Sequence, residues 1–179
     1  MDDSQNLRKY EELYSLSKAG LEDEIGRFKR IDEKASRYLA FVSLFLAALG
    51  FIVKDVGNLL AWGTVSFWLI AASILGMFSA TLVSLYALFL TLRIQPLKKI
   101  PMSPELIQFF DRNSYLDIIY ALTKGNIEAA QENKITTDRK TNRLTTAYRA
   151  LMVALFFLSI CICTALFLSY NMVRSRGVH

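Results

Sequence analysis

Residues suited to catalysis or metal binding are scarce in this sequence. Its 179 residues include one histidine, His179, and two cysteines, Cys161 and Cys163. On a helix, residues two apart point about 200° from one another, so the cysteines cannot form a disulfide with each other. Neither a metal site nor a Cys–His pair can be assembled from this set, and no glycine pattern fits a phosphate-binding loop. We therefore expect no enzyme activity, no metal and no cofactor.

Charge is missing from three long stretches, which are residues 38–53, 56–92 and 150–173. A helix needs roughly 20 apolar residues to cross a bilayer, and the second and third stretches exceed that length. The first stretch is shorter, but Arg37 and Lys54 flank it, and their long side chains can reach the headgroups. We expect an all-α integral membrane protein with three transmembrane helices and a cytoplasmic helical bundle formed by extended helices.

The distribution of lysine and arginine predicts the orientation in the membrane. Residues 1–37 hold 8 of them and residues 93–149 hold 10, whereas residues 54–61 hold 1 and residues 174–179 hold 2. Basic residues near spans prefer the cytoplasmic side. The N-terminus and residues 93–149 are therefore expected inside, with the short tail 174–179 outside. No ionisable residue lies deep in a span, which disfavours a pump or coupled transporter.

The N-terminal half divides into an amphipathic helix and a hairpin. Residues 1–37 carry apolar side chains at helical spacing and run without proline into the first span, so one long helix is expected. Residues 38–92 then form a transmembrane hairpin, with a turn at residues 54–58 and a second span over residues 59–92. The apolar face of the first helix consists of Leu7, Tyr10, Tyr14, Leu21, Ile25, Phe28, Ile31 and Ala35.

The C-terminal half begins with a connector that breaks the helix, because all three prolines, Pro96, Pro101 and Pro104, lie within it. Within the cytoplasmic segment 93–149, one helix is expected to start at Ser103 and another at Ser114, the second ending at Gly125. A single helix is then expected from residue 126 through the third span, 150–173. Its cytoplasmic part is polar and needs a partner, for which the N-terminal helix is suited. Its sparse apolar contact points are Ile127, Ala130, Ile135 and Leu144.

Two groups of residues in this sequence suggest a function. The second span repeats small residues every four positions, at Ala72, Gly76, Ala80 and Ser84. Small residues let helix backbones approach closely in lipid, so this ridge indicates packing within one subunit, self-association between subunits, or the lining of a pore.

The second group is a basic and aromatic cluster in the segment 93–149. Lysine and arginine next to aromatic rings can hold a small phosphorylated ligand by charge and stacking. The same composition also fits a basic patch that faces anionic lipid headgroups, with the rings in a protein core. The basic residues are Lys98, Lys99 and Arg112, and the aromatic ones are Phe109, Phe110 and Tyr115.

The segment 27–41, Arg-Phe-Lys-Arg-Ile-Asp-Glu-Lys-Ala-Ser-Arg-Tyr-Leu-Ala-Phe, resembles the entry to the first span in small transmembrane effectors of bacterial cyclic-nucleotide antiphage defence. The relatives in question are the Pycsar transmembrane effectors and the broader SLATT group. Asp32, Lys34 and Ala35 match their Asp-x-Lys-Ala element. A structural role also suits these residues, since Asp32 can pair with a basic group of a neighbouring helix and Lys34 can reach headgroups.

The resemblance implies a function in the bacterial inner membrane. Such a chain would form a homo-oligomer in the lipid bilayer, respond to a cyclic nucleotide, and disrupt membrane integrity by oligomerisation or pore opening. It would bind no nucleic acid polymer, and the cytoplasmic helices would have to form the nucleotide site. Two alternatives stay open, a membrane-anchored protein-binding module and a small channel subunit.

Overall fold

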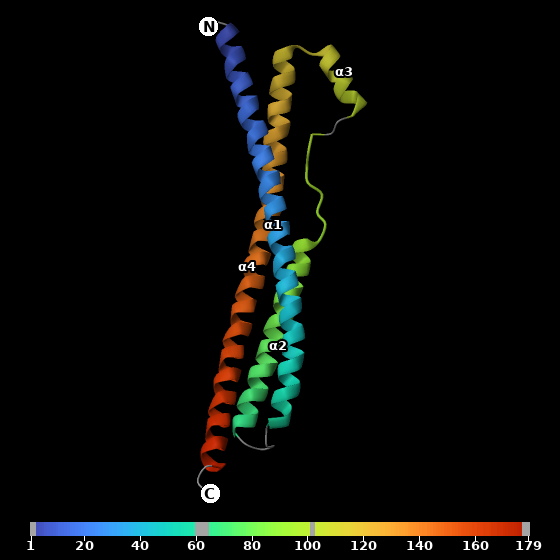
Figure 1. The fold of residues 1–179 in the computed structure, drawn as a ribbon. Helices are drawn as coiled ribbons and strands as arrows, with labels where there is room; N and C mark the ends of the chain where they lie inside the picture. The colour runs from blue at the N-terminus through green and yellow to red at the C-terminus, as the bar shows by residue number, and fades with distance from the viewer. Residues whose placement is uncertain (1–2, 60–64, 101–102, 177–179) are drawn as a thin grey trace. The chain divides into compact units, whose positions relative to one another are not determined.

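All regular secondary structure in the described part of the chain is helical. The computed structural model describes residues 3–59, 65–100 and 103–176. These residues form α1 (Asp3–Leu59), α2 (Val65–Leu92), α3 (Pro104–Arg112) and α4 (Tyr115–Arg176) (Figure 1). The all-α class predicted from the sequence is confirmed for these residues.

Three helices contain segments that are long and apolar enough to cross a membrane. They are Leu7–Phe51, Phe67–Leu92 and Tyr115–Tyr170. Many large apolar side chains point outward from these helices, and a continuous apolar surface is unusual for a protein in water. Hydrocarbon suits such a surface, which agrees with the three predicted spans. The most exposed of these side chains include Leu44, Phe51, Trp68, Leu75, Phe156 and Phe167.

The single long N-terminal helix is confirmed, but the predicted turn at residues 54–58 is wrong. α1 continues through these positions to Leu59, and α2 begins at Val65 rather than near residue 59. The residues between them, 60–64, lie outside the described part. A glycine such as Gly57 costs only about 1 kcal/mol inside a helix, so it is a weak stop signal when the flanking residues are helical.

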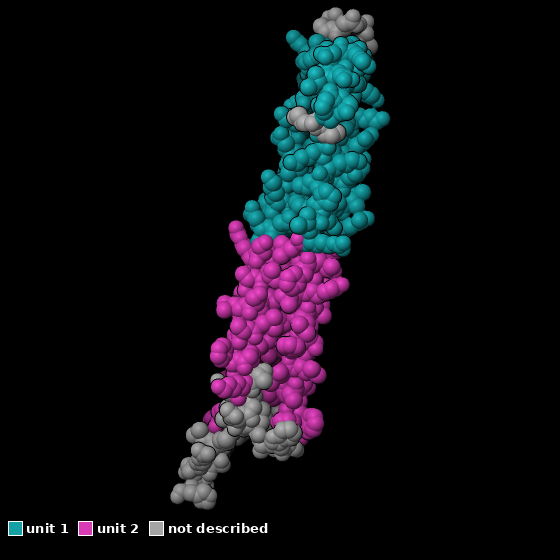
Figure 2. Space-filling view, turned by 90° about the vertical axis from the view of Figure 1, so that its right-hand side faces the viewer, with its two compact units in different colours: residues 1–33, 93–141 teal, residues 34–92, 142–179 magenta. Residues whose placement is uncertain are grey.

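The chain divides into two compact units, coloured separately in Figure 2. Unit 1 consists of residues 1–33 and 93–141, and in it the first part of α1 packs on the first part of α4. The predicted apolar face of α1 is at least partly buried, as expected. The buried apolar residues of unit 1 are Leu21, Phe28, Ile31, Ile118, Ile119 and Ala129.

Unit 2 consists of residues 34–92 and 142–179, and its core lies among α1, α2 and α4. Leu49, Met77 and Ala154, one from each helix, form a central contact cluster. The buried hydroxyl groups of Ser73, Thr81 and Thr91 on α2 donate to carbonyls of the same helix. Thr81 Oγ1 donates to the Met77 carbonyl at 2.7 Å, and Thr91 Oγ1 donates to the Ala87 carbonyl at 2.8 Å. Each buried hydroxyl group that the structure describes on α2 donates a hydrogen bond, as a lipid environment requires.

The connector, defined here as residues 93–103, separates α2 from α3 as the prolines predicted. α3 starts directly after Ser103, whose side chain does not cap the helix backbone. Its hydroxyl instead hydrogen-bonds the Glu105 carboxylate, which lowers the pKa of Glu105. α3 itself has no buried residue.

α4 starts where the sequence predicted but does not end at Gly125. Ser114 Oγ accepts a hydrogen bond from the Asp117 backbone N–H at 3.3 Å, which caps the start of the helix, and donates to Asp117 Oδ2 at 2.7 Å. The helix then continues through Gly125, where Ile100 of the connector lies against it. The predicted stop is wrong because contacts along α4 outweigh the modest helix penalty of one glycine.

Candidate functional site

A hollow of about 260 Å³ lies in unit 1 between the connector, α3 and α4. Its walls combine an apolar floor with charged side chains. Because the described part of the chain holds no group of three or more metal-ligating side chains, the chemistry of the hollow is that of charge and apolar contact. It is lined by Lys98, Lys99, Ile100, Leu106, Phe109, Ala121, Leu122, Gly125, Glu128 and Ala129.

The charged groups around the hollow differ in whether they form an ion pair. The Lys98 ammonium contacts Glu132 Oε1 at 2.5 Å, and Lys124 lies 4.0 Å from Glu128. Lys99 forms no ion pair with any residue that the structure describes. The two carboxylates are therefore neutralised by lysines, and Lys99 supplies an uncompensated positive charge at the hollow.

The basic and aromatic cluster predicted from the sequence is brought together in part. Lys98, Lys99 and Phe109 all line the hollow, but Arg112, an exposed residue at the end of α3, does not. Phe110 instead forms an apolar surface of α3 with Leu106 and Ile107.

Tyr115, the remaining member of that cluster, belongs to a different contact. Its hydroxyl donates to Glu11 Oε1 of α1 at 3.0 Å, and this hydrogen bond raises the pKa of Tyr115. Its ring does not line the hollow. Sequence proximity to Arg112 therefore did not predict its neighbours, because the cap at Ser114 starts a new helix between them.

Sequence reasoning missed Asn133, which fixes the connector beside the hollow. Its side-chain amide donates to the Lys98 carbonyl at 2.9 Å and accepts from the Lys98 backbone N–H at 2.9 Å. Asn133 is only 2% exposed, so both hydrogen bonds are shielded from water. An asparagine on a polar helix was the one available signal, and it gave no hint that its partner lies in the connector.

Asp32, from the element that resembles the antiphage effectors, pairs with a buried lysine of α4. Lys140 Nζ lies 2.6 Å from Asp32 Oδ1 and 3.9 Å from the centroid of the Phe28 ring. The Lys140 side chain is 1% exposed and that of Asp32 is 36% exposed. Lys34 is exposed, and Ala35 is fully buried in unit 2.

Other polar contacts join α1 to α4 within unit 1. Asn126 Nδ2 donates to Ser17 Oγ at 3.3 Å, and Arg27 Nη2 donates to Asp138 Oδ1 at 3.0 Å. The predicted contact points Ile127 and Ile135 are exposed instead, so that prediction is wrong for both. Polar side chains of α4 lie on its inner face because they hydrogen-bond to polar side chains of α1. The number of apolar residues in α4 could not predict these contacts.

The small-residue ridge of α2 lies partly against α4 of the same chain. At Gly76, an added Cβ would lie 2.9 Å from two ring atoms of Phe157. Ser84 Oγ donates to the Ala147 carbonyl at 2.9 Å. Ala80 packs on the central cluster of unit 2, whereas Ala72 is exposed. Close approach of α2 to α4 therefore depends on Gly76 and Ser84.

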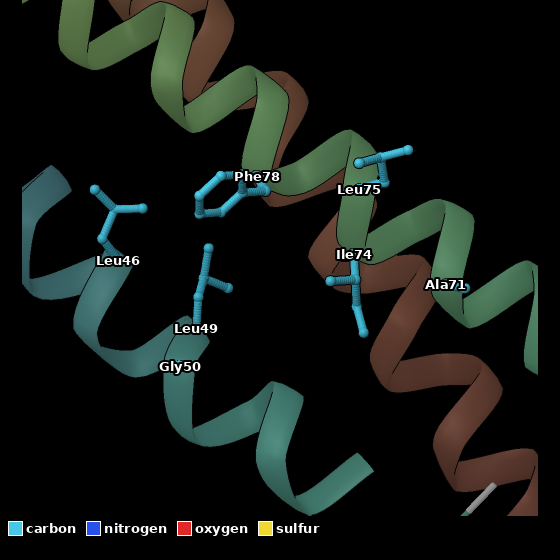
Figure 3. Close-up of a pocket in the computed structure, with 7 residues that line it drawn as sticks. All are labelled: Leu46, Leu49, Gly50, Ala71, Ile74, Leu75 and Phe78. Carbon is cyan, nitrogen blue, oxygen red and sulfur yellow. The ribbon is translucent and has the colours of Figure 1, made fainter. Parts of the chain in front are cut away.

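A second hollow, of about 590 Å³, lies between α1 and α2 in unit 2. Leu46 and Leu49 of α1 and Phe78 of α2 point into the space between the helices (Figure 3). No lining residue has a polar side chain, so this groove offers apolar contact without hydrogen bonding. The lining residues are Leu46, Leu49, Gly50, Ala71, Ile74, Leu75 and Phe78.

Comparison of the chain with protein-family models, curated proteins and solved structures finds no match. A function for this chain is therefore inferred from the geometry described above and from the resemblance at residues 27–41.

Proposed function

We propose that this chain is a membrane effector of a bacterial antiphage system that responds to a cyclic nucleotide and disrupts the inner membrane by oligomerisation or pore opening. The observation that carries the proposal is the hollow at Lys98, Lys99 and Phe109 in unit 1. Ammonium groups bind phosphate, and an aromatic ring stacks on a base. Small-molecule sites are commonly about 300–1,000 Å³, so a hollow of about 260 Å³ fits a mononucleotide better than a dinucleotide.

α4, which borders the hollow, also contributes to the predicted spans. α4 supplies residues to unit 1 and unit 2, as does α1. In unit 1 the two helices are joined by polar contacts, among them the Asp32–Lys140 pair of the resembling element. A ligand that changes how α1 and α4 pair would therefore act on helices that continue into membrane-spanning segments. The N-terminus and residues 93–149 would lie in the cytoplasm, where such a messenger is made.

The proposal is tested by dye release from liposomes that contain the purified chain. Cyclic CMP, cyclic UMP, cyclic AMP and cyclic GMP are added on both sides, with the linear monophosphates as controls. We expect one cyclic nucleotide to trigger release, and Lys99→Ala to lower its potency by about tenfold, since hydrogen bonds to charged groups contribute roughly 1.5–3 kcal/mol. Lys29→Ala is the matched control, because Lys29 is an exposed lysine of α1 that does not line the hollow.

Liposomes that stay sealed with every nucleotide would contradict the proposed function. Equal loss of dye release in Lys99→Ala and Lys29→Ala would also contradict it, because the hollow would then not be the binding site.

One observation favours a second candidate function, a membrane-anchored protein-binding module: Ile107 and Phe110 of α3 are 66% and 45% exposed. Sealed liposomes together with a stoichiometric cytoplasmic partner retained on α3 would favour that module.

A further inference from the structure

Lys98 makes two kinds of contact, one through its backbone and one through its side chain, and a ligand could replace the second more easily than the first. Its backbone N–H and carbonyl are both bound by the buried amide of Asn133. Its ammonium contacts Glu132 Oε1, and in this pair the side chains of lysine and glutamate are 53% and 57% exposed. Buried hydrogen bonds hold their geometry, whereas exposed ion pairs are weak and are screened by salt. The main chain of Lys98 is therefore fixed, while the partner of its ammonium is exchangeable.

We propose that Glu132 is a built-in competitor, a carboxylate that occupies the Lys98 ammonium until a phosphate-bearing ligand displaces it. This inference rests on the proposed function, from which it takes the class of ligand, a cyclic mononucleotide. It adds a mechanism that regulates binding at the hollow. A phosphate offers more acceptor oxygens than one carboxylate. It can contact Lys98 and Lys99 together, because these residues are neighbours and both line the hollow. Among the residues that the structure describes, Glu132 forms an ion pair with Lys98 alone.

The arrangement of charge explains why displacement is favourable. Before a ligand arrives, Lys99 has no ion pair among the described residues and can attract an anion. Once the anion is present, it shares the Lys98 ammonium with Glu132, and repulsion between the two negative groups drives the carboxylate away. Glu132 precedes Asn133, the residue that clamps the connector on α4. Ligand binding therefore changes the contacts of the turn of α4 that holds the connector.

The test compares the affinity of the full-length chain in detergent for cyclic CMP and for inorganic phosphate. We expect Glu132→Gln to bind the effective anion about fivefold more tightly, a factor that matches the upper end of the contribution of an exposed ion pair. In a Lys98→Met background the same Glu132→Gln change should have no effect, because the competitor has lost its target. Glu22→Gln is the matched control, since Glu22 is an exposed glutamate of α1 that does not line the hollow.

The outcomes separate the two ideas. Suppose that the wild type binds an anion while Glu132→Gln strengthens binding no more than Glu22→Gln does, or equally with and without Lys98. Either result overturns the competitor and leaves the ligand site standing. If neither the wild type nor Glu132→Gln binds any probe, the proposed function fails along with it. Glu132→Asp, which keeps the charge and shortens the side chain, should fall between wild type and Glu132→Gln, and it provides the measurement should Glu132→Gln be too unstable to purify.

Discussion

Lys140 carries a charge that is removed from solvent almost completely. Its ammonium has one carboxylate partner, Asp32, and the face of the Phe28 ring. Removing the partner of a buried charge leaves that charge without compensation, which is far more costly than losing a surface pair. The pair is asymmetric, because Asp32 is 36% exposed and can be hydrated if its lysine is lost.

Asp32→Asn should therefore lower the free energy of unfolding in mixed micelles by about 3 kcal/mol. Lys140→Met should cost less, since the carboxylate that remains can reach water. Asp23→Asn is the control on the same helix, because its pair with Arg30 is exposed on both sides, and its cost should stay below about 1 kcal/mol. Equal losses for Asp32→Asn and Asp23→Asn, measured by detergent-titrated unfolding, would show that Lys140 is not effectively buried.

α4 presents two chemically different inner faces along its length. In unit 1 its buried residues are largely polar, including Asn126, Asn133 and Lys140. In unit 2 they are apolar, including Leu151 and Ala154. The apolar face suits packing between spans, where shape rather than hydrophobic drive decides how closely helices approach. The contact between Gly76 of α2 and Phe157 of α4 is the place where this packing can be tested most directly.

Gly76→Ala should destabilise the contact between α2 and α4, because the new Cβ would lie 2.9 Å from the Phe157 ring. Overpacking of this kind costs about 1–3 kcal/mol, which exceeds the helix-propensity gain of about 1 kcal/mol. Gly50→Ala, where nothing lies within 4 Å, should be neutral or mildly stabilising. Unfolding in mixed micelles measures both, and the penalty should disappear in a Phe157→Ala background. A Gly76→Ala variant as stable as Gly50→Ala would contradict the packing described here.

Elements that depend on composition over many residues could be predicted from the sequence. The uncharged stretches gave the candidate spans, and the prolines gave the connector, because solvation and the missing proline N–H act locally. Helix boundaries that depend on a single residue could not be predicted from the sequence. Gly57 and Gly125 both read as stops, but the helices continue through them because one glycine costs little against the contacts around it.

The candidate site was predictable only as a set of residue types. Lys98, Lys99 and Phe109 share a hollow, whereas Arg112 and Tyr115 lie elsewhere because the break between α3 and α4 separates them. Glu132 and Asn133 were missed entirely. Their partners are about 35 residues away in sequence, and only tertiary contact brings the connector onto α4.

At the scale of the whole chain, unit 2 has a surface that indicates which solvent surrounds it. Its outer surface exposes large side chains such as Leu44, Trp68 and Phe156, while hydroxyl groups such as that of Thr81 are buried and hydrogen-bonded. This distribution is the reverse of the usual one in water and fits hydrocarbon. If all three spans cross the membrane, we expect the two termini on opposite sides, with the more basic N-terminal side in the cytoplasm.

Labelling of single cysteines with a membrane-impermeant maleimide tests this topology. Gln5→Cys and Ser175→Cys are made separately in a chain in which Cys161 and Cys163 are replaced by alanine. In intact spheroplasts we expect Ser175→Cys to be labelled at once and Gln5→Cys to be labelled only after the membrane is opened. Labelling of both positions from the same side, or recovery of the chain in the soluble fraction without detergent, would contradict a protein with three membrane spans.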